Sequence, residues 1–396
     1  MKDPEILVVS GGAESVSSAV VEWATSMGEL VSVFALGKTS LLAGAIPREN
    51  LYFSPGGSYA DVLSALIEHV VVIRRCLPSP VLGFATEDDS LRLLLDAERH
   101  LGGDVLRCSR CRAVTGGGLD KAALFSMLSA AGMERYIAET QVVSSEADLA
   151  RATAHLGNDL VIKPSSKLFG AGLVNGAKVH VGLDLSRGDM REERERDFEV
   201  GRDWVAQRKL KPLGGGERSA CVVRDASGNV HYAEVVEWVK YPARGGSACI
   251  VETQPGSYLL NEAALAILEA VDAVGVVELS FLADDQGAPR LLELNIRPWL
   301  QAELLQKSGF DVFGDALHVL KGGALRHARV QLDSRSWLSL ERLLLKLLLG
   351  DGAERRRTAV SAWRALRHRP VISVWCSRLP GVRWRWVKRM WRGARS

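Results

Sequence analysis

Short hydrophobic runs alternate with helically spaced segments at the start of the chain. Residues 5–12 (EILVVSGG) predict a buried strand, and residues 30–36 (LVSVFAL) predict a second one after a helical pattern. We expect a third strand at 70–76 (VVVIRRC), followed by the apolar run VLGFAT and a helix over 88–102. This alternation is typical of a parallel α/β sheet, and it places the first domain at residues 1–115.

The second unit, residues 116–210, is expected to contain a linker helix and a small domain. Asp120 can cap a helix over 118–133, because its side chain can accept from the first free N–H groups. Residues 159–166 (DLVIKPSS) predict a strand that leads into the glycine-bearing loop KLFGAG. The alternating charges of 189–204 indicate a solvated helix face.

Antiparallel strands dominate the third unit, residues 211–330. RSACVVRD and VHYAEVVEWV flank a turn at 226–229 and predict a hairpin. After a helix at about 259–273, two more strands at 274–285 and 288–298 are joined by a turn that contains glycine.

The charge of the chain is unevenly distributed. The 396 residues contain 50 Lys and Arg against 47 Asp and Glu, with 47% hydrophobic residues, which excludes disordered and fibrous classes. Residues 341–396 alone carry 15 basic and 3 acidic residues, so they hold a net +12 and the first 340 residues hold −9. We therefore separate a basic, Trp-rich helical tail, residues 331–396, from an acidic body.

This tail has three interpretations. Residues 337–396 hold six of the ten Trp residues among many Arg and Lys, a composition that suits contact with an anionic membrane surface. Binding of nucleic acid or another polyanion is less favoured, and packing on the protein's own body or on a second subunit stays open. The chain has no run of 18 apolar residues and no signal-peptide pattern, so we expect a cytoplasmic protein, peripheral at the inner membrane face.

The cysteines suggest no chemistry of their own. Six of them in a chain of this length are too scattered for a disulfide framework and are expected to be thiols. Cys108 and Cys111 form a single C-x-x-C, and no second pair follows at the spacing of a zinc site.

Charged and amide side chains inside predicted strands suggest a Mg-ATP site. Lys163 lies on a strand just before a Ser- and Gly-containing loop, where an ammonium group can reach phosphate oxygens. Glu293 and Asn295 are two apart on one strand and therefore share a face, and Glu278 can meet them across the hairpin. Such groups are costly in buried strands unless a ligand or metal pairs with them.

These segments resemble the ATP-grasp superfamily over residues 1–330. The matching pieces are DKAALFSMLSAAGM, VIKPSSKLFGAG, WVAQRKLKP and GVVELSFLADDQGAPRLLELNIRPWLQAEL. Together with GERSACVVRDASGN and VKYPARGGSA, they look like the carboligase-type group of carboxylate-amine ligases. The resemblance implies an α/β and α+β fold with a pre-ATP parallel α/β domain, a small lid domain and a C-terminal α+β catalytic domain.

The resemblance also implies the reaction and the roles of residues. A carboxylate would attack the γ-phosphate of ATP to give an acyl phosphate and ADP, and an amine would then displace phosphate. Lys121, Lys163, Ser165, Ser166, Lys167 and Gly170 would contact the nucleotide phosphates, and Gln207, Arg208, Lys209 and Leu210 would line the adenine. Glu278, Glu293 and Asn295 would hold Mg²⁺ or Mn²⁺. Arg297 and Lys163 would stabilise the phosphoryl group, and Arg244 would bind the substrate carboxylate.

One departure from the family pattern concerns the adenine site. Gln207 and Arg208 stand where many relatives place a Glu beside the adenine, so the adenine contacts would be mainly backbone groups.

The substrates would be small carboxylates and amines, such as amino acids, peptides or amino sugars, and a homodimer is common among relatives. The alternatives are another ATP-grasp phosphotransferase or carboxylase-like enzyme, and a membrane-docked ATP-binding regulator without catalysis.

Overall fold

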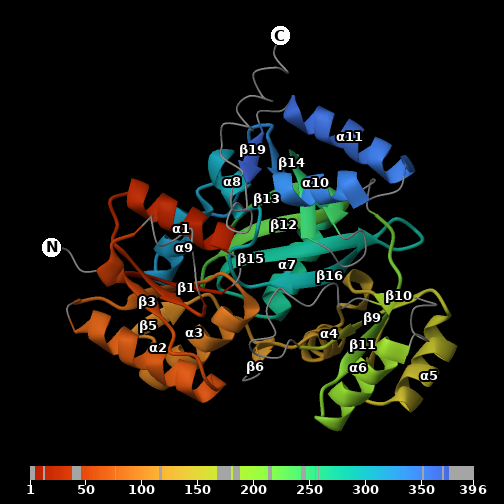
Figure 1. The fold of residues 1–396 in the computed structure, drawn as a ribbon, viewed down its shortest axis with the longest axis horizontal. Helices are drawn as coiled ribbons and strands as arrows, with labels where there is room; N and C mark the ends of the chain where they lie inside the picture. The colour runs from red at the N-terminus through yellow and green to blue at the C-terminus, as the bar shows by residue number, and fades with distance from the viewer. Residues whose placement is uncertain are drawn as a thin grey trace.

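The chain folds into three packed units. We describe a computed structural model covering residues 5–11, 14–37, 46–75, 77–115, 118–166, 180–181, 188–212, 216–241, 247–254, 256, 258–349, 352–367 and 370–373. Figure 1 shows the N-terminal unit at the left, a small four-stranded unit at the lower right, and a large sheet that spans the centre.

The N-terminal unit is the predicted parallel sheet, with strand order β3-β2-β1-β4-β5. All neighbouring strands of this sheet pair in parallel, and helices cover the sheet. The elements are β1 (Ile6–Ser10), α1 (Glu14–Ser26), β2 (Val31–Ala35), β3 (Leu51–Phe53), α2 (Tyr59–Arg74), β4 (Val81–Ala85), α3 (Asp88–Leu101) and β5 (Leu106–Cys108).

The strand predicted at 70–76 is wrong. Most of this segment is the last turn of α2, which begins 12 residues earlier at a capping box: Ser58 N–H donates to Asp61 Oδ2 at 2.8 Å, and Asp61 N–H donates to Ser58 Oγ. The helix buries residues at helical spacing, namely Val62, Ala65, Leu66, Val70 and Ile73. The cap and this period outweigh the local β preference of the valine run.

The small unit is an antiparallel sheet with strand order β10-β9-β11-β8. Its elements are α4 (Lys121–Ala130), β8 (Thr140–Val143), α5 (Glu146–Leu156), β9 (Leu160–Pro164), β10 (His180–Val181), α6 (Gly188–Glu199) and β11 (Trp204–Arg208). Asp120 caps α4 as predicted, because its Oδ1 accepts from Ala123 N–H at 2.9 Å.

The charged segment predicted to be a solvated face is only partly solvated. It forms α6, but the Arg194 side chain is buried and donates to Glu146 at 2.9 Å. Asp197 is also buried, and it accepts from Trp204 Nε1 at 2.9 Å and from the Arg202 guanidinium at 3.0 Å. The alternating charges therefore attach α6 to α5 and β11.

The large sheet contains both predicted hairpins. Its main strand order is β16-β15-β12-β13-β14-β18-β19, and β12 pairs antiparallel with both β13 and β15. The elements are β12 (Glu217–Arg224), β13 (Val230–Tyr241), β14 (Ser247–Gln254), α7 (Tyr258–Ala270), β15 (Gly275–Ala283), β16 (Pro289–Asn295), α8 (Ala302–Lys307), α9 (Val312–Leu320), β17 (Ala328–Arg329), β18 (Ser336–Ser339), α10 (Leu340–Leu349), α11 (Gly352–Leu366) and β19 (Val371–Ser373).

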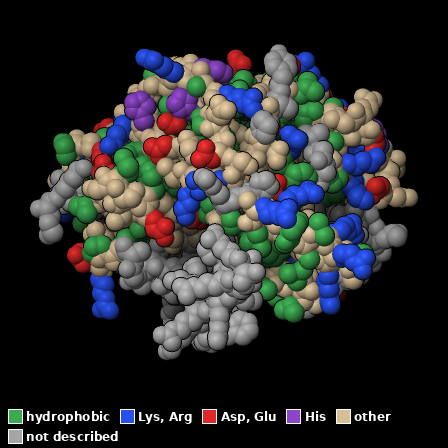
Figure 2. Space-filling model, turned by 90° about the horizontal axis from the view of Figure 1, so that it is seen from above, with side chains coloured by type: hydrophobic (Ala, Val, Ile, Leu, Met, Phe, Trp, Pro, Cys, Tyr) green, Lys and Arg blue, Asp and Glu red, His purple; other side chains and the backbone are tan. Residues whose placement is uncertain are grey.

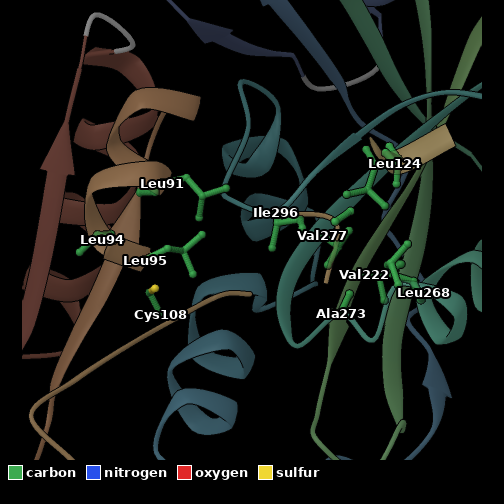
Figure 3. Packing of buried hydrophobic residues seen from close by; sticks show 14 of the residues in the cluster. Leu91, Leu94, Leu95, Cys108, Leu124, Val222, Leu268, Ala273, Val277 and Ile296 are labelled. Carbon is green, nitrogen blue, oxygen red and sulfur yellow. The ribbon is translucent and has the colours of Figure 1, made fainter. Parts of the chain in front are cut away.

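One continuous hydrophobic core joins the N-terminal unit to the large sheet. Figure 3 shows Leu91 and Leu95 of α3 facing Ile296 and Val277 across the space between the two units. The same cluster continues to Leu268 of α7, so the two units pack as one body. This packing brings the carboxyl end of β4 close to the end of β16.

The C-terminal segment begins inside the large sheet. β18 pairs antiparallel with β14, β19 pairs parallel with β18, and the side chain of Trp337 is 1% exposed. α10 and α11 pack over β13, β14 and β18 at the upper right of Figure 1. The boundary expected at residue 330 therefore does not separate two packing units, because the large sheet continues past it to residue 373. Residues 374–396 lie outside the described part of the chain.

Within the described residues, no helix combines the length and apolar character needed to cross a bilayer.

Removing the Trp337 side chain tests whether this segment belongs to the fold. Trp337→Ala should lower the free energy of unfolding by about 3–5 kcal/mol, because it removes a large buried side chain and leaves a cavity in the core. Trp363→Ala is the control, because Trp363 is 58% exposed and should change stability little. Chemical denaturation measures both, and equal small effects would contradict the packing described for β18.

Candidate nucleotide and metal site

Lys163 points from the small unit toward the large sheet. It lies on β9, its side chain is 6% exposed, and its Nζ donates to the backbone carbonyl of Leu292 on β16 at 2.9 Å. Burial, with a smaller contribution from the charge of Lys121, lowers the pKa of Lys163 to about 8. The carboxylates of Glu293 and Glu217 oppose this shift, which places both near the ammonium group.

Hydrogen bonds connect the start of α4 to the end of β9. Ser165 Oγ donates to Asp120 Oδ1 at 2.5 Å and accepts from Ala122 N–H at 2.8 Å. Lys121 N–H donates to the carbonyl of Ser165 at 2.9 Å. These bonds hold Lys121 near enough to Lys163 for its charge to act on that lysine. They also occupy the Ser165 hydroxyl, so its predicted phosphate contact would require exchange of these partners.

Of the remaining predicted phosphate- and carboxylate-binding residues, Ser166 lies in the described part of the chain. The carbonyl of Ser166 accepts from Arg202 Nε at 2.8 Å. Lys167 and Gly170 lie outside the described residues, and so does Arg244.

The predicted metal ligands meet on one face of the large sheet. Glu278 of β15 pairs with Asn295 of β16, and Asn295 Nδ2 donates to Glu278 Oε2 at 3.1 Å. Glu293 is two residues before Asn295 and pairs with Ser280, so its side chain shares this face. The convergence predicted from the E-x-N spacing and the hairpin is therefore found in the structure.

Glu278 is held in an environment that disfavours its negative charge. Burial and, to a smaller extent, the nearby carboxylates of Glu237 and Glu293 together raise the pKa of Glu278 to about 8 against the hydrogen bond from Asn295. A divalent cation would relieve both effects, because it replaces lost hydration and neutralises the neighbouring charges.

The donor set fits a magnesium ion that is completed by other ligands. Two carboxylates and one amide oxygen are hard oxygen donors, and Mg²⁺ in nucleotide sites keeps water and phosphate in its remaining positions. Within the described residues, no group of three or more His, Cys, Asp and Glu side chains forms a complete metal site. Glu278, Glu293 and Asn295 thus suit a nucleotide-bound cation better than a closed structural site.

Arg297 is positioned by a residue that the sequence interpretation missed. Its Nε donates to Oδ1 of Asp88, the first residue of α3, at 2.8 Å, and its Nη2 donates to Asn295 Oδ1 at 3.3 Å. Burial opposes the charge of Arg297, but the ion pair with Asp88 outweighs it and raises the pKa of Arg297. The N-terminal unit therefore reaches the site, a contact that spacing along the chain does not reveal.

A second buried ionic group lies on the same face of the sheet and was also missed. Lys240 Nζ donates to Glu217 Oε2 at 2.5 Å and lies 3.3 Å from Glu237 Oε2, while Glu237 Oε1 accepts from Gln301 Nε2 at 2.9 Å. Burial raises the pKa of Glu237 to about 7 despite Lys240, whereas the two carboxylates raise the pKa of Lys240. The alternation of β13 shows that Glu237 faces inward, but Gln301, which donates to it, comes from the segment after β16, and Glu217, which accepts from Lys240, comes from β12.

The predicted adenine segment covers the end of β11 and the start of the connection toward β12. Gln207 is buried and donates to Thr140 Oγ1 at 2.9 Å, so its amide is engaged by β8. Arg208 pairs with Glu139 at 2.9 Å, and Lys209 pairs with Asp159 at 2.8 Å. The backbone N–H groups of Arg208 and Lys209 donate to the carbonyls of Glu139 and Asp159, both at 3.2 Å, so an adenine contact through backbone groups stays a prediction.

A pocket of about 690 Å³ adjoins this connection. Its lining combines the end of β11, the segment around β8, α4 and the turn between β15 and β16, and includes Phe125, Ile137, Thr140, Arg208, Leu210 and Arg290. Three of the four predicted adenine residues, Arg208, Lys209 and Leu210, line it. The connection therefore borders a space of ligand size.

A buried lysine without a ligand should reduce stability in a way that depends on pH. At pH 7 the folded protein must bury the Lys163 charge, whereas the unfolded chain keeps its proton up to a pKa near 10.5. Lys163→Met should therefore raise the free energy of unfolding at pH 7, by about 2 kcal/mol. The wild type gains stability as the pH rises from 8 to 10.5, so the difference should shrink there.

Chemical denaturation at pH 7 and at about pH 9.5 measures this difference. The control is Lys307→Met, which alters a half-exposed surface lysine and should show no such change with pH. A Lys163→Met variant that is less stable than the wild type at both pH values would contradict the burial cost.

The geometry agrees with the comparisons to known proteins. No family model matches the chain. D-alanine–D-alanine ligases of Neisseria meningitidis serogroup B and Neisseria gonorrhoeae are 26% identical to it over 207 residues. The match covers 47% of this chain and 64% of each ligase, so it spans less than two thirds of those proteins.

Solved structures are similar over most of the chain. N5-carboxyaminoimidazole synthetase from Staphylococcus aureus, complexed with ADP, has a TM-score of 0.62 at 15% identity and covers 89% of this chain and 86% of its own. L-amino acid ligase from Bacillus licheniformis has a TM-score of 0.57 at 15% identity, covering 81% and 75%. Biotin carboxylase from Campylobacter jejuni, in an ATP-type complex, has a TM-score of 0.57 at 13% identity, covering 81% and 72%. The predicted fold class is thus confirmed, and the chain has the ATP-grasp fold.

Proposed function

We propose that the protein is an ATP-dependent carboxylate-amine ligase. A carboxylate oxygen of the substrate attacks the γ-phosphorus of ATP, and the bond to the β-phosphate oxygen breaks to release ADP. The amine then attacks the carbonyl carbon of the acyl phosphate, phosphate leaves, and the amine loses a proton to give an amide. Such a reaction needs no nucleophilic side chain, because positioning and charge neutralisation provide the catalysis.

The observation that carries the proposal is the placement of buried charges on facing elements. Lys163 projects from the small sheet onto β16, where Glu293 and Asn295 meet Glu278 across the hairpin. These groups fit the two charged parts of Mg-ATP, since the ammonium group suits the phosphates and the carboxylates suit the cation. Without a ligand, the hydrogen bonds to Leu292 and Asn295 offset the cost of burying Lys163 and Glu278 only in part, because the pKa values of both groups stay shifted toward their neutral forms.

The residues have separate roles in this mechanism. Lys163 and Lys121 bind phosphate oxygens and reduce their repulsion toward the attacking carboxylate. Glu278, Glu293 and Asn295 would hold Mg²⁺ or Mn²⁺, which supplies charge neutralisation between the phosphates when bound. Arg297, fixed by Asp88, presents its guanidinium to the transferred phosphoryl group or to the acyl phosphate.

A second candidate function uses bicarbonate as the carboxylate. It is favoured by the similarity to N5-carboxyaminoimidazole synthetase and to biotin carboxylase, which have the same fold. The phosphorylated intermediate would then be carboxyphosphate, and the product would be a carboxylated amine. A regulator that binds ATP without catalysis is less favoured, because it would have no need for three aligned metal donors.

The acceptor and the location are also part of the proposal. The amine and carboxylate would be small molecules such as amino acids, peptides or amino sugars, and Arg244 would contact the substrate carboxylate. We place the enzyme in the cytoplasm, with the C-terminal segment 337–396 as its contact to an anionic membrane surface. Assembly as a homodimer stays a proposal as well.

Removing two metal donors tests the site assignment. The double variant Glu293→Ala with Asn295→Ala should reduce ADP release by at least about a thousandfold, because the phosphates lose their cation. Circular dichroism should show an intact fold, and Glu269→Ala, which alters an exposed residue of α7, is the control. Turnover by the double variant at the wild-type rate would exclude these residues as metal ligands.

A screen for trapped intermediates tests the reaction and separates the two candidate functions. The wild type is incubated with ATP, Mg²⁺, hydroxylamine and one carboxylate at a time, and mass spectrometry detects the hydroxamate. A ligase should form the hydroxamate of its own carboxylate with equimolar ADP, because hydroxylamine intercepts an acyl phosphate. ADP release that depends on bicarbonate alone would favour the second candidate, and release of AMP would contradict both.

A further inference from the structure

Exposed hydrophobic side chains are concentrated on the two C-terminal helices. Of the thirteen large hydrophobic residues that are exposed in the described part of the chain, six lie between residues 340 and 366. They are Leu344, Leu345, Leu348, Val360, Trp363 and Leu366, with exposed fractions from 44% to 67%. Scattered single residues of this kind are ordinary, but a cluster on two adjacent helices marks an interaction surface.

These residues lie on the sides of α10 and α11 that face away from the body. The inner side of α10 is occupied by Leu343, and by Lys346, which donates to the carbonyl of Lys240 at 2.9 Å and to Glu354 at 2.5 Å. The inner side of α11 packs through Ala362 and Ala365. The contact of these helices with the large sheet is therefore made by other residues, and the outer leucines remain 44% to 67% exposed in the described chain.

The outer surface is strongly basic as well as apolar. α11 carries exposed Arg355, Arg356, Arg357 and Arg364, Arg367 follows the helix, and the acid of α11, Glu354, is neutralised by Lys346. The guanidinium of Arg367 lies 3.4 Å from the centre of the Trp363 ring. Figure 2, which views the molecule from above Figure 1, shows hydrophobic and basic side chains next to one another on this side.

We propose that the outer face of α10 and α11 is a membrane-docking surface that binds bilayers containing anionic lipid. The exposed leucines, Val360 and Trp363 enter the interface between headgroups and acyl chains, and the arginines pair with lipid phosphates and carboxylates. We call the six exposed hydrophobic residues, Leu344, Leu345, Leu348, Val360, Trp363 and Leu366, the docking face. This proposal rests on the membrane contact proposed above for segment 337–396 and assigns it to α10 and α11. It does not depend on the ligase chemistry.

The charge pattern favours a lipid surface over other occupants. A second copy of the chain would bring an identical row of arginines against this one, and like charges across an interface are unfavourable. Nucleic acid would use the arginines but leaves the leucines without a role, because bases stack on aromatic rings. Interfacial helices combine these two features, with apolar residues beside cations.

The sequence after the last described strand has the same character. Residues 374–396 contain seven basic residues, no acidic residue and four Trp residues. A single weak apolar contact holds a protein to a bilayer only briefly, and stable association needs a second signal. The docking face and the basic terminus together supply two such signals.

Vesicle sedimentation with matched variants tests the proposal. The full chain is mixed at low salt with vesicles of phosphatidylcholine alone or with added phosphatidylglycerol, and the pelleted fraction is measured. Leu348→Gln with Trp363→Gln should weaken binding to the anionic vesicles by at least about tenfold, because two interfacial side chains are lost. The control, Leu259→Gln with Val72→Gln, removes two similarly exposed residues from α7 and α2 and should bind like the wild type.

A chain ending at residue 373 separates the two signals. Loss of binding in this truncation, with unchanged binding of the Leu348→Gln, Trp363→Gln variant, would overturn the docking face while leaving a membrane role for the terminus. Equal sedimentation of the wild type with both vesicle types would overturn the proposal outright. Two other results would also overturn it: a dimer that the face variant disrupts in light scattering, and nucleic-acid binding that this variant abolishes. ADP release in solution should stay unchanged in the face variant, so failure here is distinct from failure of the ligase proposal.

Discussion

The burial of opposite charges between two sheets is the constraint on which the site depends. Lys163 reaches from β9 to the backbone of β16, where Glu293 acts on its charge, and Glu278 lies on β15 near the carboxylates of Glu237 and Glu293. Burial lowers the pKa of the lysine and raises the pKa of the glutamate, so each group is held in its charged form only at a cost. Under the proposed function, bound nucleotide phosphates and a divalent cation would relieve both costs at once. The free-energy cost of burying these charges and the proposed binding of Mg-ATP thus have one physical origin.

The sequence predicted the parts of the site that are close along the chain. The E-x-N spacing and the hairpin turn place Glu293, Asn295 and Glu278 on one face because strand side chains alternate and paired residues lie opposite each other. Asp88 could not be predicted, because it reaches Arg297 only through the packing of α3 on the large sheet. Glu237 and Lys240 were missed for a similar reason, since their partners belong to β12 and to the segment after β16.

The fold errors have the same physical basis. The run of valines before Arg74 looks like a strand in isolation, but it continues a helix whose cap lies at Ser58. The tail was separated at residue 330 because its composition changes there, yet Trp337 belongs to the core of the large sheet. The basic composition of this segment reflects its exposed side chains, whereas the pairing of β18 with β14 makes the segment part of the large sheet. The basic character of α10 and α11 is therefore compatible with their being part of the fold.

The central claim is that Glu278, Glu293 and Asn295 hold a cation bound to the nucleotide. Calorimetric titration of ADP in the presence and absence of Mg²⁺ tests it directly, with the wild type compared to the Glu293→Ala, Asn295→Ala variant. We expect Mg²⁺ to tighten ADP binding to the wild type at least about tenfold, by bridging the phosphates to the carboxylates. The variant should bind ADP without metal as the wild type does and show no gain from Mg²⁺. An equal gain from Mg²⁺ in both proteins would contradict the account.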